Sequence, residues 1–139
     1  MSRKHTAKEF DKSNKWLAIG VDLAKYDNTI VGITEDGEVQ IIERISTADL
    51  LELASEIQPT TFAIEPCNGA NILSLNLQAK GHEVKMISGA AVKDWVIVHL
   101  AGQKTDCNDA LALTHLSRDT MLIPIRTKTV AEMLSLIHI

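Results

Sequence analysis

The apolar run over residues 16–21, followed at once by Asp22, constrains the fold of this chain more than any other feature. Its side chains do not alternate between apolar and polar, which is the pattern of a β-strand buried on both faces. A lone carboxylate at the end of such a strand is unfavourable unless it is paired or bound to a metal ion. The run therefore predicts a central strand whose terminal Asp22 needs a partner.

The segments that follow predict an α/β layer structure. Residues 28–33 and 38–42 have strand patterns on either side of a turn that ends in Gly37, so the chain begins with a three-strand meander. Helices and strands then alternate: a helix from Ser46 to Pro59, a strand over 61–64, a helix capped by Asn68 and ended by Gly81, a strand over 82–87, an amphipathic helix over 92–100, a helix from Lys104 to about Arg118, an extended piece over 121–125 and a helix from Thr127 onward.

The order of these elements brings a second carboxylate, Glu65, toward Asp22. A long connection that contains a helix joins strand 16–21 to strand 61–64, so the two strands can lie parallel and adjacent. Asp22 and Glu65 follow these strands directly. They would then stand side by side at one edge of the sheet, where ligands bind in open α/β folds.

Asp106 and Asp109 form a further pair, three residues apart at the start of a predicted helix and therefore on one face of it. If this face meets Asp22 and Glu65, the four groups cannot all ionise without a cation, because like charges raise one another's pKa. Mg²⁺ suits such all-oxygen sites, and two metal ions would activate an attacking oxygen and stabilise the leaving one. We therefore expect these carboxylates to bind metal and to act on nucleic-acid phosphates.

A plainer interpretation of the helical pair needs no metal. Thr105 or Asp106 caps the helix, and Asp109 lies favourably near the positive end of the helix dipole. Taken alone, the pair favours this interpretation. The two carboxylates at the ends of apolar runs shift the balance toward a metal site.

Composition limits the choice of partners and compartment. The net charge of −4, from 14 basic and 18 acidic residues, argues mildly against a generic nucleic-acid coat protein, but four acids in a metal site would leave the charges balanced. Lys93 and Lys104 are candidate phosphate contacts, although each is more often an ordinary surface lysine. Cys67 and Cys107 form neither a disulfide framework nor a zinc spacing, which is typical of the cytoplasm. No apolar run approaches the roughly 20 residues of a membrane span.

Domain organisation follows from the same patterns. The chain of 139 residues is long enough for one domain with a core. Residues 1–15 are basic and lack apolar periodicity, so we expect a flexible arm there. The domain itself is expected over 16–130.

Four motifs, in order, resemble one known family. They are IGVDLAK at 19–25, AIEPCNGA at 63–70, GHEV at 81–84 and KTDCNDA at 104–110. With them the chain resembles the N-terminal domain of the DEDD transposases of the "one-ten" insertion-sequence family, over roughly residues 16–130.

The resemblance implies a ribonuclease-H-like, RuvC-type mixed sheet in which a catalytic tetrad binds Mg²⁺ or Mn²⁺; the tetrad is Asp22, Glu65, Asp106 and Asp109. It implies a transposase or recombinase that cleaves and exchanges DNA strands, is guided by a structured RNA, and forms a homo-oligomer when full length. Family members carry a second, C-terminal domain with a nucleophilic serine. Residues 131–139 are therefore expected to begin a truncated continuation, and the fragment to be an incomplete enzyme.

Three other functions stay open at this point. A stand-alone Holliday-junction resolvase shares the fold and the metal chemistry but cleaves branched DNA without RNA or a second domain. A degenerate remnant would bind nucleic acid without catalysis. An actin-like or sugar-kinase ATPase also begins with a strand, an Asp and a meander, but it needs glycines where Leu23, Ala24 and Lys25 stand here.

Overall fold

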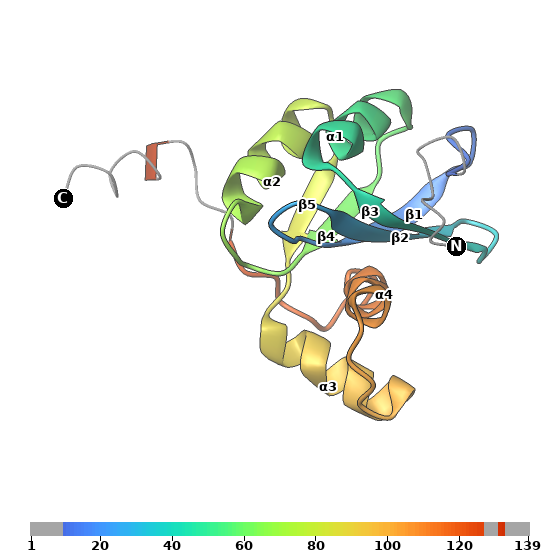
Figure 1. The fold of residues 1–139 in the computed structure, drawn as a ribbon, viewed down its shortest axis with the longest axis vertical. Helices are drawn as coiled ribbons and strands as arrows, with labels where there is room; N and C mark the ends of the chain where they lie inside the picture. Colours follow the sequence, from blue (N-terminus) through green and yellow to red (C-terminus); the bar gives the residue numbers. More distant parts are fainter. Residues whose placement is uncertain (1–9, 127–130, 133–139) are drawn as a thin grey trace.

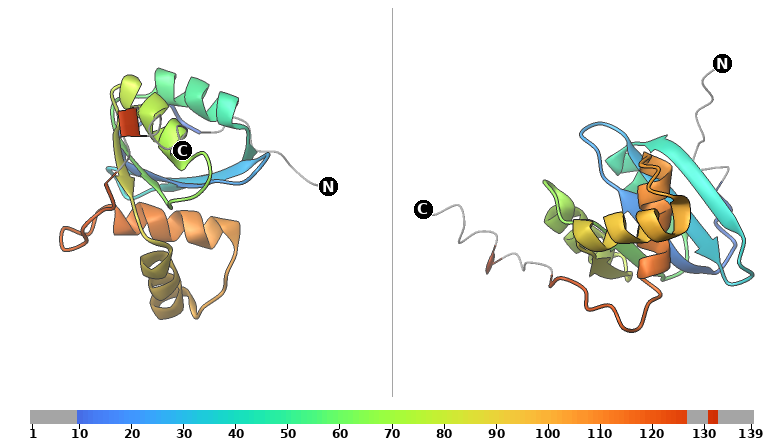
Figure 2. Two further views of the ribbon diagram at one scale, coloured as in Figure 1. Left: turned by 90° about the vertical axis from the view of Figure 1, so that its left-hand side faces the viewer. Right: turned by 90° about the horizontal axis from the view of Figure 1, so that it is seen from below.

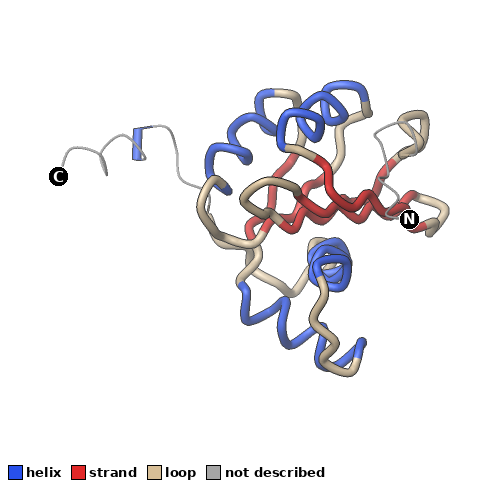
Figure 3. The backbone as a smooth tube through the Cα atoms, in the orientation of Figure 1, coloured by secondary structure: helices blue, strands red, loops and turns tan. Residues whose placement is uncertain are grey.

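The computed structural model describes residues 10–126 and 131–132. A mixed sheet lies between two layers of helices (Figures 1 and 3). The elements, in chain order, are β1 (Trp16–Asp22), β2 (Asn28–Thr34), β3 (Val39–Ile45), α1 (Thr47–Glu56), β4 (Thr61–Ile64), α2 (Ala70–Ala79), β5 (Glu83–Met86), α3 (Gly89–Leu100) and α4 (Asp106–Leu116).

The sheet has the order β3-β2-β1-β4-β5, with β1 at its centre. β1 to β3 form the antiparallel meander, and β4 and β5 run parallel to β1. Ala18, Ile19 and Val21 of β1 are fully buried although neighbouring residues point to opposite faces, so both faces are covered. The predicted central strand and the ribonuclease-H-like α/β class are therefore confirmed.

Each face of the sheet has its own apolar core. Helices α1 and α2 cover one face, while α4 packs on the other with α3 against it (Figure 2). Leucines of α1 and α2, among them Leu50 and Leu77, are buried against the first face. Val96 of α3 and Leu113 of α4 belong to the core on the second face. Full burial of such a side chain stabilises the fold by about 1.5–3 kcal/mol, so both helix layers are firmly held.

Part of the segment expected to form an arm, residues 1–15, contacts the rest of the domain. Phe10 is only 1% exposed, and its ring stacks on that of Trp16 with the centroids 4.1 Å apart. Lys12 forms an ion pair of 2.7 Å with Glu56 at the end of α1. A single aromatic residue has no periodicity, which is why the pattern did not reveal this contact. Residues 1–9 lie outside the described residues.

Three smaller predictions meet different outcomes. Gly69, in the left-handed conformation, stands at the N-cap of α2, so the predicted cap by Asn68 is wrong. The extended piece over 121–125 is present in part, because Ile125 donates its N–H to the carbonyl of Met86 at 2.7 Å. Most of the predicted helix from residue 127 and the boundary at 130 lie outside the described residues.

None of the helices that the structure describes is long and apolar enough to span a membrane.

Candidate functional site

Asp22 and Glu65 leave the sheet at the same edge. β1 and β4 are parallel, with Val21 opposite Ile64. Asp22 ends β1 and Glu65 follows β4 directly, and both are half-buried. The strand register therefore brings the backbones of these two residues side by side at one edge of the sheet, as their places in the sequence predicted.

Asp106 and Asp109 approach this edge from the first turn of α4. The hydroxyl of Thr105 caps the helix by accepting the backbone N–H of Asn108 at 3.0 Å. Because Thr105 provides the cap, the carboxylate of Asp106 is not needed for it and can approach Asp22. Asp109 lies further along the same turn and is buried.

The close approach of α4 to the sheet depends on Gly20 and Thr114. The Thr114 hydroxyl accepts the N–H of Gly20 at 2.9 Å and donates to the carbonyl of Val31 or of Ala110, each at 2.8 Å. A Cβ atom on Gly20 would overlap the carbonyl oxygen of Ala110. Gly20 thus lets α4 lie directly on the strand that carries Asp22, which fixes the distance between the two sets of carboxylates.

The charges at this edge act on one another. Burial raises the pKa of Asp22 to about 7, and the charge of Asp106 and a hydrogen bond with it add to this effect. The charge of Asp109 acts in the same direction, while the ammonium of Lys104 opposes it. Lys104 also forms an ion pair with Asp109, with 2.5 Å between Nζ and Oδ2. Asp22 resists ionisation because it is half-buried and lies near Asp106 and Asp109. A bound cation would be favoured at such a place.

The two cysteines near the carboxylates do not suit a metal site. Burial raises the pKa of Cys107 to about 12, aided by a hydrogen bond of 3.1 Å in which its thiol donates to Glu43. Burial and the charge of Glu65 likewise raise the pKa of Cys67. Without a metal ion both thiols therefore stay protonated at neutral pH, and the thiolate is the form that binds metal. The donors at this edge are therefore carboxylate oxygens, the set that Mg²⁺ prefers.

The spacing of these donors is wider than a closed metal site would need. Among the residues that the structure describes, no three His, Cys, Asp or Glu side chains lie close enough together to hold a metal ion. Asp22 and Asp106 share a hydrogen bond, Lys104 holds Asp109, and Glu65 packs against Gly89. The residue types thus fit a divalent cation, and the side chains would have to close around it.

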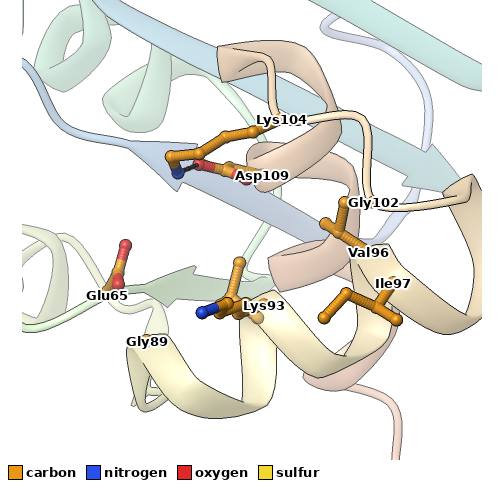
Figure 4. Close-up of a pocket in the computed structure, with 9 residues that line it drawn as sticks. Glu65, Gly89, Lys93, Val96, Ile97, Gly102, Lys104 and Asp109 are labelled. Carbon is orange, nitrogen blue, oxygen red and sulfur yellow. Dashed lines mark hydrogen bonds and ion pairs between the residues drawn. The ribbon is translucent and has the colours of Figure 1, made fainter.

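A cavity of 520 Å³ adjoins two of the four carboxylates. Glu65 and Asp109 lie on its border, and Figure 4 shows the Lys104 side chain reaching Asp109 with Glu65 on the other side. Side chains of α3 form the remaining wall, with Val96 apolar and Lys93 charged. The cavity therefore combines acidic, basic and apolar surfaces next to the end of β4.

Comparison with known proteins decides which family this arrangement belongs to. A family model for transposases, of the DEDD type named after IS110, matches residues 19–138. The chain belongs to this transposase family.

Curated relatives are transposases as well. The chain is 29% identical over 113 residues to a putative transposase (y4pF/y4sB) of Sinorhizobium fredii, covering 80% of this chain and 28% of the relative. It is 27% identical over 134 residues to the transposase for insertion sequence element IS1111A of Coxiella burnetii, covering 94% and 36%. It is 30% identical over 95 residues to the transposase for IS1328 of Yersinia enterocolitica, covering 68% and 27%. The chain thus spans about a third of the length of these relatives.

The structure brings some of the predicted site residues closer together than others. Asp22, Asp106 and Asp109 lie within electrostatic reach of one another. Glu65 acts by charge on Lys104, and both predicted lysines line the cavity. Their roles as metal ligands and as phosphate contacts stay predictions.

Three residues that position this site were missed by sequence reasoning. A glycine inside an apolar strand, Gly20, is a known sign of close backbone approach and could have been used. Thr114 among apolar helix residues is a weaker signal of the same contact. Gly89, against which the Glu65 carboxylate packs, gave no signal, because that contact joins distant parts of the chain.

Proposed function

We propose that this domain is the metal-dependent catalytic part of a DEDD transposase and acts on DNA phosphodiester bonds through Mg²⁺, or Mn²⁺ in its place. The proposed ligands are Asp22, Glu65, Asp106 and Asp109. The observation that supports this most is the state of Asp22, which ends the central strand with its pKa raised to about 7 by burial and by Asp106. Membership of a transposase family supports DNA as the partner.

In the proposed chemistry, the carboxylates hold the metal ion and the lysines contact the DNA. A bound metal ion would supply an activated oxygen nucleophile and offset charge on the phosphate. Asp22 offers its oxygens from the rigid central strand, and Asp109 from a helix fixed to that strand. The ammonium groups of Lys93 and Lys104 are placed on the cavity border, where they could contact the phosphate chain.

We further propose that the full-length protein exchanges DNA strands, is guided by a structured RNA and works as a homo-oligomer. This part rests on family membership alone. The chain spans only about a third of the length of its relatives, so the structure does not contain the remainder of such a protein. A stand-alone resolvase-like nuclease would use the same carboxylates without a second domain. An inactive remnant would keep the fold and lose the response to metal.

Metal binding tests the proposal directly. Adding Mg²⁺ or Mn²⁺ should raise the melting temperature by about 5–10 °C at a hundredfold excess over the dissociation constant, because binding to the native state stabilises it. Asp22→Asn should abolish most of this shift. The control is Asp36→Asn, an exposed carboxylate in the turn between β2 and β3, at the other end of the sheet. A shift that is unchanged in Asp22→Asn would remove Asp22 from the metal site.

A further inference from the structure

The ion pair between Lys104 and Asp109 joins a buried carboxylate to an exposed lysine side chain. The side chain of Asp109 is 9% exposed, whereas that of Lys104 is 81% exposed. Lys104 lies in the loop just before the N-cap of α4, and its Nζ reaches Asp109 Oδ2 at 2.5 Å (Figure 4). The lysine stem can therefore rotate away into solvent without any movement of the helix, while Asp109 stays in place.

The Lys104 ammonium lies within electrostatic reach of three of the proposed metal ligands. Its hydrogen bond with Asp109 raises the pKa of Lys104, and the charges of Asp109, Asp22 and Glu65 add to this effect. The influence is mutual, since Lys104 stabilises the ionised form of Asp22. Lys104 thus lies where a positive charge is favoured by three of the four carboxylates.

We infer that Lys104 is an internal counter-cation, which holds the carboxylate of Asp109 in the metal-free protein and is displaced when a divalent cation binds. This inference rests on the proposed metal site. Leaving the buried carboxylate of Asp109 without a cation would be unfavourable, so a lysine in reach keeps the metal-free site stable. The same contact means that a metal ion must compete with Lys104 for Asp109 Oδ2. Lys104 is therefore a positioning residue that lowers the affinity of the site for metal.

The experiment measures the dissociation constant for Mg²⁺ by isothermal titration calorimetry. Lys104→Met, which keeps an apolar stem, and Lys104→Ala should each bind Mg²⁺ about two- to fivefold more tightly than the unmodified protein, which is the range for a partly exposed ion pair. Lys104→Arg keeps the cation and should bind Mg²⁺ like the unmodified protein. The matched control is Lys93→Ala, which removes a positive charge from the same cavity but not from the ion pair with Asp109.

The outcomes separate this inference from the proposed function. An unchanged affinity in both Lys104→Met and Lys104→Ala, or an equal gain in Lys93→Ala, would overturn the role of Lys104 and leave the metal site standing. Tighter binding that is confined to the two uncharged Lys104 variants supports it. Binding of Mg²⁺ that appears only in these variants also supports it. Absence of Mg²⁺ binding from every variant would overturn both proposals.

Discussion

Glu65 differs from the three aspartates in how its side chain is held. Its carboxylate packs against the first residue of α3, Gly89, where a Cβ atom would overlap Glu65 Oε1. Because glycine has no side chain, the Glu65 carboxylate can occupy this space. Glu65 itself was predictable from its place after an apolar strand. Gly89 was not, because its role exists only once β4 and α3 lie together.

Gly89→Ala should disturb the site while leaving the fold intact. The added Cβ pushes the flexible end of Glu65 aside, and stability should change by no more than about 1 kcal/mol because alanine suits a helix better than glycine. Mg²⁺ affinity should fall about tenfold, as it does when neighbours of metal ligands are changed. Calorimetry and urea unfolding measure the two effects. Ala90→Ser, at an exposed position of the same turn, is the control, and equal affinity in both variants would contradict this role for Gly89.

At the scale of elements, the site depends on how α4 crosses the sheet. Periodicity predicted that α4, β1 and β4 exist, and the long crossing predicted that β1 and β4 are parallel neighbours, as the structure confirms. It did not predict where α4 crosses the sheet, because that is set by the contact between Thr114 and the β1–β2 ladder at Gly20. Local patterns carry little information on contacts between residues so far apart in the chain.

Thr114→Val should destabilise the domain by about 1–3 kcal/mol, because the buried N–H of Gly20 loses its acceptor. Urea unfolding gives the change in the free energy of unfolding. Thr114→Ser keeps the hydroxyl and should lose only about 1 kcal/mol with its methyl group. If serine proved as harmful as valine or more so, packing rather than the hydroxyl would hold α4.

At the scale of the whole molecule, the net charge argues against a nucleic-acid partner, whereas the residues of the cavity are compatible with one. The net charge of −4 does not favour nucleic acid, yet four of the acidic residues lie around a proposed cation site and two lysines line its cavity. The fold class and the two-layer arrangement followed from the alternation of apolar runs. The contacts of residues 10–15 did not follow from it, because a ring stacked on Trp16 and an ion pair with Glu56 leave no periodic pattern in the sequence.

The domain should bind DNA and structured RNA in a salt-dependent manner. Two lysine–phosphate contacts predict that affinity falls about tenfold between 50 and 200 mM salt. Fluorescence anisotropy with labelled duplex DNA and hairpin RNA measures this dependence. The double change Lys93→Ala and Lys104→Ala should flatten the dependence, whereas Lys12→Ala, paired with Glu56 at α1, should not. Binding that ignores salt, or no binding to any DNA or RNA tested, would count against nucleic-acid partners.

The central position of β1 has a consequence for synthesis on the ribosome. β1 is made before every other strand, but its second neighbour, β4, and the helix that covers it, α4, emerge much later. Until then the backbone N–H and C=O groups along one edge of β1 have no partner strand. An apolar strand with an unpaired edge can associate with other nascent chains and aggregate. The same delay keeps Asp22 apart from Asp106 and Asp109 until α4 has been made. A nascent chain therefore cannot bring the proposed metal ligands together before α4 has left the ribosome.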